Sequence, residues 1–359
     1  MIIYFVFPVI VFIFYLFANS NLNNNNNTAF FLYGLLLIFL VIFAGFRGEY
    51  VSRDYQNYIS FFNQIKAGQS VSVINDLGFT YISRLAFLLS NTYIYLFVIY
   101  ASIGVSVKLF SFYKILGIRF SFLGVIIYFS NFYLLHEMTQ IRVGVATGIF
   151  LISIRYIINR QFIKFLICLA IAAFFHVTIL LVLPLYFLKF ERVKPVFWIG
   201  LLSLNIVFFL FNVSFLDIIQ VFTPDSFASK VKVLNSTMLE SQGSTNIRIF
   251  NRFLMYLILN LFLLYYWKLL AQKSKYFVFL LKASFISLSI AFFLYDSYVF
   301  AYRLSEIIGV VQICLFAMIA YLFNNRVFGA GMVLLLALFL LLINIGFTGL
   351  LQSYYFNTI

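Results

Sequence analysis

The sequence predicts an all-α, polytopic membrane protein. Of its 359 residues, 64% are hydrophobic, 21% are aromatic and only 9% are charged, and the mean hydropathy is +1.06. A soluble core does not need this much apolar surface, whereas a bundle of membrane-crossing helices does. The apolar runs also lack the apolar–polar alternation of transmembrane barrels. We therefore expect a single transmembrane domain over residues 1–359.

About ten apolar runs are long enough, at 1.5 Å per residue, to cross a hydrocarbon core of roughly 30 Å. They fall near residues 2–18, 29–46, 91–113, 120–135, 139–158, 195–213, 251–271, 277–295, 300–322 and 328–347. The first run lacks a basic leader and a small-residue cleavage site. We interpret it as a retained span rather than a signal peptide.

Basic residues orient these spans, because short cytoplasmic loops are enriched in lysine and arginine. Three clusters are assigned to the cytoplasm on this rule: Lys108–Lys114–Arg119, Arg155–Arg160–Lys164 and Lys268–Lys273–Lys275–Lys282. The outer side then receives loops 47–90 and 214–250, the turns 135–139 and 296–303, and the C-terminal tail. Within the first outer loop, the stretch from Asp76 to Ser90 is expected to form an interfacial helix.

The apolar run 162–188 does not obey the charge rule as one span, because basic residues flank it on both sides. A re-entrant hairpin with His176 near its tip keeps both flanks cytoplasmic, provided that its broken backbone is buried or lines a water-filled cavity. The alternative is one ordinary span with a local exception to the rule.

Several classes of function are excluded by composition and motif. The two cysteines, Cys168 and Cys314, lie in apolar runs, so neither a disulfide framework nor a zinc site is expected. The formal charge of +14 is attributed to cytoplasmic loops and anionic lipid, and no nucleic-acid partner is expected. The chain has no P-loop, dinucleotide fingerprint or nucleophile elbow, and we expect no cofactor and no metal.

Arginines at or near membrane depth gather on the predicted outer side. A charge at bilayer depth costs roughly 2.5–3.5 kcal/mol, so it is retained for a partner or a ligand. Arginine forks match phosphate oxygens, which favours a pocket for an anionic, lipid-linked substrate. The arginines concerned are Arg47, Arg53, Arg142, Arg248, Arg252 and Arg303. Internal ion pairs, contact with lipid headgroups and, for Arg142, extension of the side chain to the interface are the alternatives.

Polar residues beside the first two arginines complete one part of the candidate site. Asp54 is suited to orient a hydroxyl or accept a proton, or simply to hold an arginine. Tyr55 and Tyr58 are suited to stack on sugar rings. The alternative is a juxtamembrane charge cluster that pairs with itself and with headgroups.

The remaining candidates lie further along the chain. Gln140 stands two residues before Arg142, and Gly144 and Gly148 form a small-xxx-small pair that lets a neighbouring helix approach. His176 is either a hydrogen-bonded core residue or, if it lies among the arginines, a general base.

Two more groups share a helical face. Arg248 and Arg252 are four residues apart. Asp296, Arg303 and Glu306 fall on one face if their helix is continuous, and an internal ion-pair network is the alternative there.

Taken in order, these motifs resemble a known family over about residues 40 to 310. The motifs are Phe46-Arg47, Asp54-Tyr55-x-x-Tyr58, Asp76-Leu77-Gly78-Phe79, Gln140-Ile141-Arg142-x-Gly144-x-Ala146, Phe175-His176 and Tyr302-Arg303-Leu304. The family is EpsG/Wzy, the polymerases of bacterial O-antigen, capsule and exopolysaccharide repeat units. Two positions depart from its pattern: Ser52-Arg53 replaces a small residue followed by glycine, and Asp76-Leu77 replaces an acidic-Pro pair.

The resemblance implies a multi-pass glycosyltransferase of the bacterial inner (plasma) membrane with a periplasmic or extracellular active face. It implies block transfer of a glycan from one undecaprenyl diphosphate carrier to a new undecaprenyl-diphosphate-linked oligosaccharide. Membrane lipid and a chain-length regulator protein are the other implied partners. The alternatives are a lipid-linked oligosaccharide flippase and an O-antigen ligase-type glycosyltransferase.

Roles for single residues follow from that reaction as hypotheses. Arg142 and Arg303 hold the diphosphate, because preorganised cations stabilise the charge of a departing group. Arg47 and Arg53 hold phosphate or acceptor, and His176 or Asp54 deprotonates the acceptor hydroxyl. The other predicted substrate-binding residues are Tyr55, Tyr58, Gln140, Arg248, Arg252 and Glu306. The tail residues Tyr354 and Tyr355 are further candidates for stacking on sugars.

Overall fold

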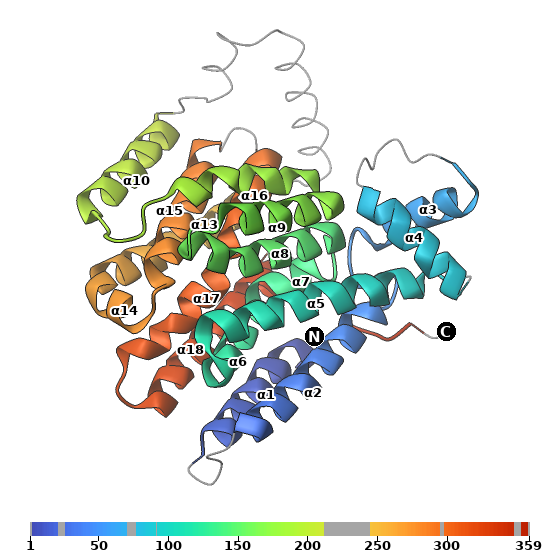
Figure 1. Cartoon of the computed structure of the whole chain (residues 1–359), viewed down its shortest axis with the longest axis horizontal. Coiled ribbons are helices and arrows are strands. Elements are labelled where there is room, and N and C mark those ends of the chain that lie inside the picture. The colour runs from blue at the N-terminus through green and yellow to red at the C-terminus, as the bar shows by residue number, and fades with distance from the viewer. Residues whose placement is uncertain are drawn as a thin grey trace. The chain divides into compact units, whose positions relative to one another are not determined.

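The computed structural model describes residues 2–20, 26–69, 77–90, 92–211, 245–294, 298–347 and 353–357, without the side chains of 209, 245–252, 298–300 and 347. Within these ranges the regular structure is helical, which confirms the all-α class (Figure 1). The chain forms two compact units, Met1–Tyr186 with Ile313–Ile359, and Phe187–Gln312. The single transmembrane domain stays a prediction. Asp76, Asp296 and most of the loop 214–250 lie outside the described residues.

Six helical segments among the described residues are long and apolar enough to cross a membrane. They are Ile2–Asn19 (α1), Asn26–Gly45 (α2), Ile94–Leu116 (α5), Ile118–His136 (α6, η1 and α7), Ile141–Ile158 (α8) and Arg326–Gly346 (α18, Arg326–Leu342, with most of η5, Ile343–Phe347). Their lengths of 18 to 23 residues match the thickness of a bilayer core.

Two bent helix pairs raise the number of spans to eight if each pair counts as one. They are Phe253–Tyr265 with Trp267–Lys273, bent by 77°, and Ala301–Gly309 with Gln312–Leu322, bent by 53°. Two other predicted spans correspond to shorter helices, Pro195–Leu210 (α10) and Phe277–Phe293 (α15). The structure therefore supports six to eight spans, and the number of ten stays a prediction.

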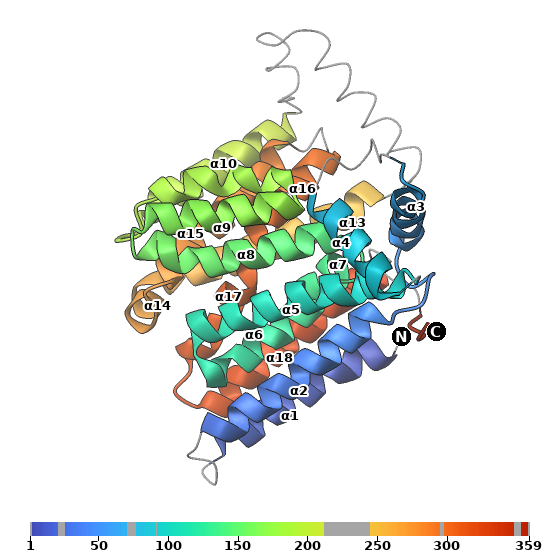
Figure 2. The same ribbon diagram turned by 45° about the vertical axis from the view of Figure 1, so that its right-hand side comes forward.

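The first unit shows how apolar helices are sorted into protein-facing and exposed sides. In α1, the buried residues Tyr4, Phe7, Val11 and Tyr15 recur every three or four positions, which places them on one helical face. That face packs against α2, α6 and α18, which lie beside α1 in Figure 2. The residues between them are apolar but exposed, as expected of a surface in contact with lipid.

A recessed turn joins α6 to α8. Helix α6 (Ile118–Tyr128) widens into the π-helix η1 (Phe129–Tyr133), which continues into the short α7 (Leu134–His136). A π-turn disturbs the regular backbone ladder, and Asn344 from η5 donates to the Ser130 carbonyl there at 2.8 Å. The turn 135–139 is buried, and its predicted place on the outer side of the membrane stays a prediction.

Glycines explain why the recessed turn packs so closely. A Cβ at Gly144 would lie 2.7 Å from the His136 carbonyl oxygen, and one at Gly148 would lie 3.2 Å from Lys108 Cγ. A Cβ at Gly104 would lie 2.3 Å from Glu137 Oε2. The predicted packing role of Gly144 and Gly148 is therefore confirmed, and it brings α5, α8 and the turn into direct contact.

The hairpin predicted over 162–188 is present as a backbone reversal. Helix α9 (Phe162–Phe175) ends at His176, whose extended backbone (φ −158°, ψ 109°) breaks it, and the 3-10 helix η2 (Val177–Phe187) follows. Arg160 Nη1 donates to the Tyr186 carbonyl at 2.9 Å, so the far end of the segment returns to its beginning. His176 lies at the reversal as predicted, and the re-entrant position in the membrane stays a prediction.

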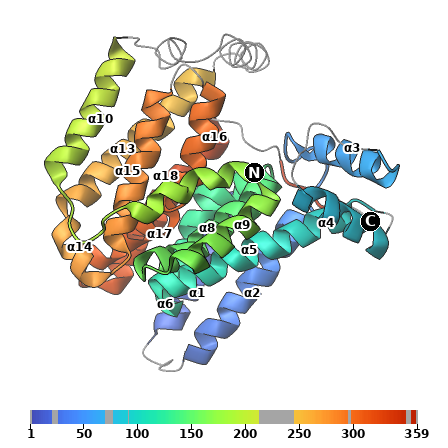
Figure 3. The same ribbon diagram turned by 45° about the horizontal axis from the view of Figure 1, so that its top comes forward.

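The loop 47–90, which was predicted to lie on the outer side, contains two helices, Tyr55–Lys66 (α3) and Leu77–Leu89 (α4), which pack together at one end of α5 (Figure 3). Helix α4 confirms that the stretch predicted as an interfacial helix is helical. It also contacts the hairpin, since a Cβ at Gly78 would lie 2.7 Å from the Phe174 carbonyl oxygen. The loop is therefore a packed layer over the bundle of its own unit.

Two lysines that the charge rule assigned to cytoplasmic loops are buried within helices instead. Lys108 is fully buried within α5, and Lys282 is 8% exposed within α15, where it donates to the Lys189 carbonyl. The rule uses only the position of a lysine along the sequence. It therefore does not distinguish a lysine in a loop from a buried lysine whose charge has partners inside a helix bundle. The side of the membrane on which each loop lies stays a prediction.

The second unit is built around α15. Helices α10, Thr245–Tyr265 (α13), Trp267–Lys273 (α14) and Tyr298–Gly309 (α16) pack on it. Ser287 Oγ donates to the Ser305 carbonyl at 2.7 Å and joins α15 to α16.

The close packing at the recessed turn leads to a stability prediction. Gly104→Ala places a methyl group against the Glu137 carboxylate and should destabilise the protein by about 1–3 kcal/mol, as overpacked cores do. The matched control is Gly34→Ala in α2, where nothing lies within 4 Å of the added atom. Thermal unfolding of the purified protein in detergent would show the difference, and equal melting temperatures would contradict the packing.

Candidate functional site

Three residues predicted to bind substrate or to catalyse act on one hydroxyl group, that of Tyr58. Tyr58 lies on the buried face of α3 and is 6% exposed. Its hydroxyl shares a hydrogen bond with Arg142 from the first turn of α8, and the charges of Asp54 and Arg47 also act on it. Burial raises the pKa of Tyr58 and Arg142 partly offsets this, so the hydroxyl is protonated at neutral pH.

Arg47 supplies a buried cation directly after α2. Its guanidinium lies over the rings of Phe97, at 4.4 Å from the ring centre, and Tyr55, at 5.1 Å. Nη1 donates to the Ala44 carbonyl at 2.6 Å, whereas Nε and Nη2 have no hydrogen-bond partner among the described residues. Burial lowers the pKa of Arg47 to about 10, so it is charged at neutral pH. Two unpaired donors on a buried cation favour an anionic ligand.

The C-terminal tail fastens the backbone on either side of Arg47. Gly48 N donates to the Tyr355 carbonyl at 2.8 Å, and Asn357 N donates to the Phe46 carbonyl at 2.9 Å. These bonds form an isolated antiparallel bridge between Arg47 and Phe356. The tail therefore closes over the loop that carries the arginine.

Tail side chains add to this attachment. The Tyr354 ring stacks on Phe43 at a centroid distance of 4.0 Å and an interplanar angle of 8°. Asn357 Nδ2 donates to the hydroxyls of Tyr55, at 3.2 Å, and Tyr93, at 3.4 Å. Tyr55 is fully buried, and Tyr354 is half-buried. Their predicted role in stacking on sugars stays a prediction.

A row of rings runs from Tyr58 to the hairpin. Tyr58 lies 5.7 Å from Phe79, Phe79 lies 6.2 Å from Tyr100, and Tyr100 lies 6.2 Å from Phe175. His176 follows Phe175 directly, so it lies at the far end of this row in the same unit. The row connects α3, α4, α5 and α9 without a charged residue in it.

The predicted site residues of the first unit differ in their exposure to solvent. Arg53 is exposed, whereas Asp54, Gln140, Arg142 and His176 are half-buried. Partial burial leaves these four side chains able to meet a ligand while their charges are less screened than at an open surface. The structure brings Arg142 and Asp54 together with Arg47 around Tyr58.

The other predicted residues belong to the second unit. On α16, Arg303 is exposed and Glu306 is 5% exposed. Arg248 and Arg252 fall on α13, and their side chains lie outside the described residues. Their roles stay predictions.

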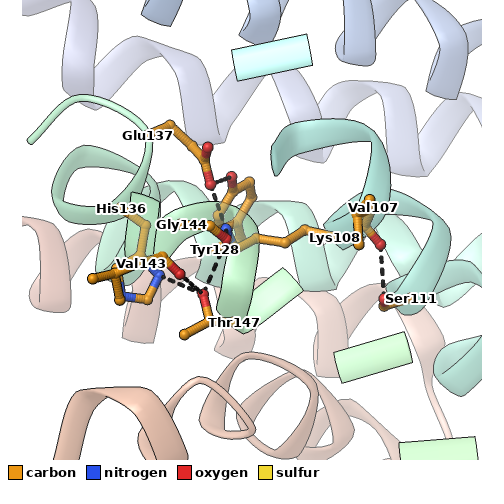
Figure 4. Close-up of polar contacts among 9 residues, drawn as sticks. All are labelled: Val107, Lys108, Ser111, Tyr128, His136, Glu137, Val143, Gly144 and Thr147. Carbon is orange, nitrogen blue, oxygen red and sulfur yellow. Dashed lines mark hydrogen bonds and ion pairs between the residues drawn. The ribbon is translucent and has the colours of Figure 1, made fainter. Parts of the chain in front are cut away.

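Sequence reasoning missed a buried polar cluster beside the recessed turn (Figure 4). Lys108 Nζ donates both to the Glu137 carboxylate and to the Gly144 carbonyl, and Tyr128 donates to Glu137 Oε1 at 2.8 Å. The signal was a single lysine well inside an apolar run, with a glutamate at the start of the turn after the next span. A buried pair of this kind is expected when both charges lie at membrane depth.

Metal ligation has no support in the described ranges, where no three His, Cys, Asp or Glu side chains are grouped to hold an ion. The residues that act on the Tyr58 hydroxyl are two arginines and one aspartate. Such a set suits recognition of a phosphate group and charge stabilisation.

The family model named EpsG family matches residues 30–357, which covers nearly the whole chain. The chain belongs to the EpsG family. This is the family of Wzy-type polysaccharide polymerases, so the resemblance drawn from the motifs is confirmed. No curated protein and no solved structure matches this EpsG-family chain.

The tail contacts of this EpsG-family protein lead to a prediction about local stability. Gly48→Ala places a Cβ 2.0 Å from Tyr355 Cε2, so it should detach the tail from the Arg47 loop. Hydrogen exchange at the amides of Gly48 and Asn357 should then accelerate by roughly tenfold or more. Gly200→Ala in α10, where the added atom meets nothing within 4 Å, is the control. Unchanged exchange would show that the tail does not hold this loop.

Proposed function

We propose that this EpsG-family protein polymerises undecaprenyl-diphosphate-linked oligosaccharide repeat units at the outer face of the bacterial inner membrane. Family membership carries the polymerase class. The observation that supports a diphosphate carrier is the convergence of Arg142 and Arg47 on Tyr58, with two donors of Arg47 unpaired. Two cations around one buried hydroxyl are suited to a group with at least two negative charges.

The reaction is a transfer of the growing glycan between two carriers. A hydroxyl at the free end of a new lipid-linked unit attacks the anomeric carbon of the growing chain. The bond from that carbon to the diphosphate oxygen breaks, a glycosidic bond forms, and undecaprenyl diphosphate leaves. The donor is already activated, so the step needs no nucleotide. Its main requirement is stabilisation of the charge on the departing diphosphate.

Each requirement of this reaction is assigned to one or two of the described side chains. Arg142 and Arg47 hold the diphosphate, and the Tyr58 hydroxyl donates to a phosphate oxygen between them. Asp54 or His176 accepts the proton of the attacking hydroxyl, since both are half-buried in the same unit. Arg53, which is exposed in the same loop, attracts the anionic acceptor.

Residues of the second unit enter the proposal from sequence alone. Arg303 is proposed as a further diphosphate ligand, and Arg248, Arg252 and Glu306 as contacts to the glycan. Gln140 is proposed as a hydrogen-bonding contact to the substrate from the start of α8. A chain-length regulator protein is proposed as a partner.

The first test is polymerisation by purified protein in lipid, supplied with its lipid-linked repeat unit and no nucleotide sugar. We expect a ladder spaced by whole repeat units. Arg142→Ala and Arg47→Ala should each lower the rate by roughly a hundredfold or more, as loss of a transition-state donor does elsewhere. Arg326→Ala is the control, because Arg326 is an exposed arginine at the start of α18 in the same unit, and its rate should stay near that of the wild type.

The same reaction separates the rival functions. Passage of the substrate between leaflets without a ladder would identify a flippase. Transfer of finished polymer to another acceptor without a ladder would identify a ligase-type enzyme. A normal ladder from Arg142→Ala would remove the central residue of the proposal, and loss of the ladder with a chelator would assign a role to metal.

A second test concerns the hydroxyl between the two arginines. Tyr58→Phe retains the ring and its contact with Phe79 but removes the oxygen that Arg142 hydrogen bonds. We expect the polymerisation rate to fall by roughly tenfold or more while the melting temperature changes little. Tyr81→Phe, an exposed tyrosine of α4, is the matched control. An unchanged rate would remove Tyr58 from the site.

A further inference from the structure

Arg47 is fully buried, although its Nε and Nη2 atoms have no hydrogen-bond partner among the described residues. Its guanidinium lies over the rings of Phe97 and Tyr55, and Nη1 donates to the Ala44 carbonyl in the last turn of α2. A ligand can meet the two unpaired donors only if part of this enclosure moves away. The structure therefore raises the question of which wall opens.

The tail segment Ser353–Asn357 forms one wall of the enclosure. Phe356 lies directly opposite Arg47 in the antiparallel bridge, and the side chains of opposite residues lie on the same face of such a pair. The Tyr354 hydroxyl donates to the Phe43 carbonyl at 2.9 Å, next to the carbonyl that accepts from Arg47. The tail thus lies beside the arginine through both its backbone and its side chains.

Asn357 also holds a second wall in place. Its Nδ2 donates to the Tyr55 hydroxyl at 3.2 Å, and the Tyr55 ring is one of the two that contact the Arg47 guanidinium. The same amide donates to the Tyr93 hydroxyl at 3.4 Å. Departure of the tail would therefore uncover the arginine and release one of its aromatic neighbours.

The tail is attached more weakly than the other walls. Phe97 is 1% exposed on α5, and Tyr55 is fully buried on α3. In the tail, by contrast, Tyr355 is 43% and Phe356 is 56% exposed, and the backbone pairs with the Arg47 loop in an isolated bridge. Segments with little buried apolar surface are the ones that open locally while the rest of a protein stays folded.

From these contacts we infer that the tail segment Ser353–Asn357 is a lid, which leaves its bridge to Arg47 before a diphosphate reaches the two unpaired donors and then closes again. The arrival of a diphosphate rests on the proposed function, whereas the shielding of Arg47 rests on the structure alone. A closed lid excludes water from the departing group and so strengthens its interaction with the guanidinium.

The experiment measures how fast phenylglyoxal, a reagent that modifies arginine side chains, labels Arg47 in the purified full-length protein, with peptide mass spectrometry as the readout. A disulfide variant, G48C/Y355C, locks the tail. Gly48 lies opposite Tyr355, since its N–H donates to the Tyr355 carbonyl at 2.8 Å. Opposite Cα atoms of an antiparallel pair lie roughly 4.5–5.5 Å apart, within the range of a disulfide.

Oxidation of G48C/Y355C should slow the labelling of Arg47 by roughly tenfold or more, and a reductant should restore it, because the disulfide suppresses local opening. The reduced form of the same variant is the matched control. The exposed Arg326 is the internal control and should be labelled at the same rate in both forms.

The opposite change loosens the tail. Gly48→Ala places a Cβ 2.0 Å from Tyr355 Cε2 and should accelerate the labelling of Arg47 by roughly tenfold. Gly34→Ala, where nothing lies within 4 Å of the added atom, should be labelled like the wild type. Melting temperatures are measured in parallel, so that rates are compared among folded proteins.

A third arm adds farnesyl diphosphate, a short polyprenyl diphosphate, to the wild type. We expect it to slow the labelling of Arg47 and to leave the labelling of Arg326 unchanged. Labelling that responds to the state of the tail while farnesyl diphosphate gives no protection keeps the lid but overturns the proposed diphosphate site.

Two results overturn the lid. Equal labelling of Arg47 in the oxidised and reduced forms of G48C/Y355C shows that the reagent reaches the arginine without departure of the tail. If the disulfide does not form, unchanged labelling of Arg47 in Gly48→Ala overturns the inference instead. Protection by farnesyl diphosphate together with either result keeps the proposed function and removes only the lid.

Discussion

The structure of the first unit depends on how buried charge is compensated among apolar helices. An ion taken out of water costs several kcal/mol unless a partner or a ligand satisfies it. Lys108 and Glu137 meet this constraint inside the protein, with Tyr128 and the Gly144 carbonyl as additional partners. Arg47 meets it only in part, through aromatic rings and one carbonyl. The charges of Lys108 and Glu137 are thus satisfied within the protein, whereas Arg47 retains two donors without a hydrogen-bond partner, which we propose for a ligand.

Close backbone approach makes the internal pair geometrically feasible. Gly104 and Gly144 leave room for the turn that follows α7, and the π-helix η1 alters the direction of the chain before it. The turn is therefore buried against α5 and α8 instead of projecting as a loop. Helix α8 begins directly after this turn, so the position of the turn determines where Arg142 lies in the unit.

The layer formed by α3, α4 and the C-terminal tail of the same unit has a complementary role. Helix α3 turns Tyr55 and Tyr58 inward, and the C-terminal tail binds the backbone around Arg47 through paired hydrogen bonds. Segments from near the two ends of the chain thus meet at one arginine. For a protein of a polysaccharide polymerase family, we propose that this arrangement forms a preorganised cationic site.

The sequence by itself determined the all-α class and the family, and it predicted Arg47, Asp54, Tyr58 and Arg142 as site residues and a hairpin over 162–188 as one of two alternatives. These features follow from composition, charge and motif order, which are local properties of the chain. Only the tertiary structure decided that Lys108 lies inside the bundle and pairs with Glu137, that Tyr55 is fully buried, and that Arg47, Asp54 and Arg142 act on the Tyr58 hydroxyl. The reason is physical: a side chain's partner depends on which helices approach one another in space. These helices are apolar both on the side that faces lipid and on the side that faces protein. Their apolar patterns therefore do not specify which helices are neighbours.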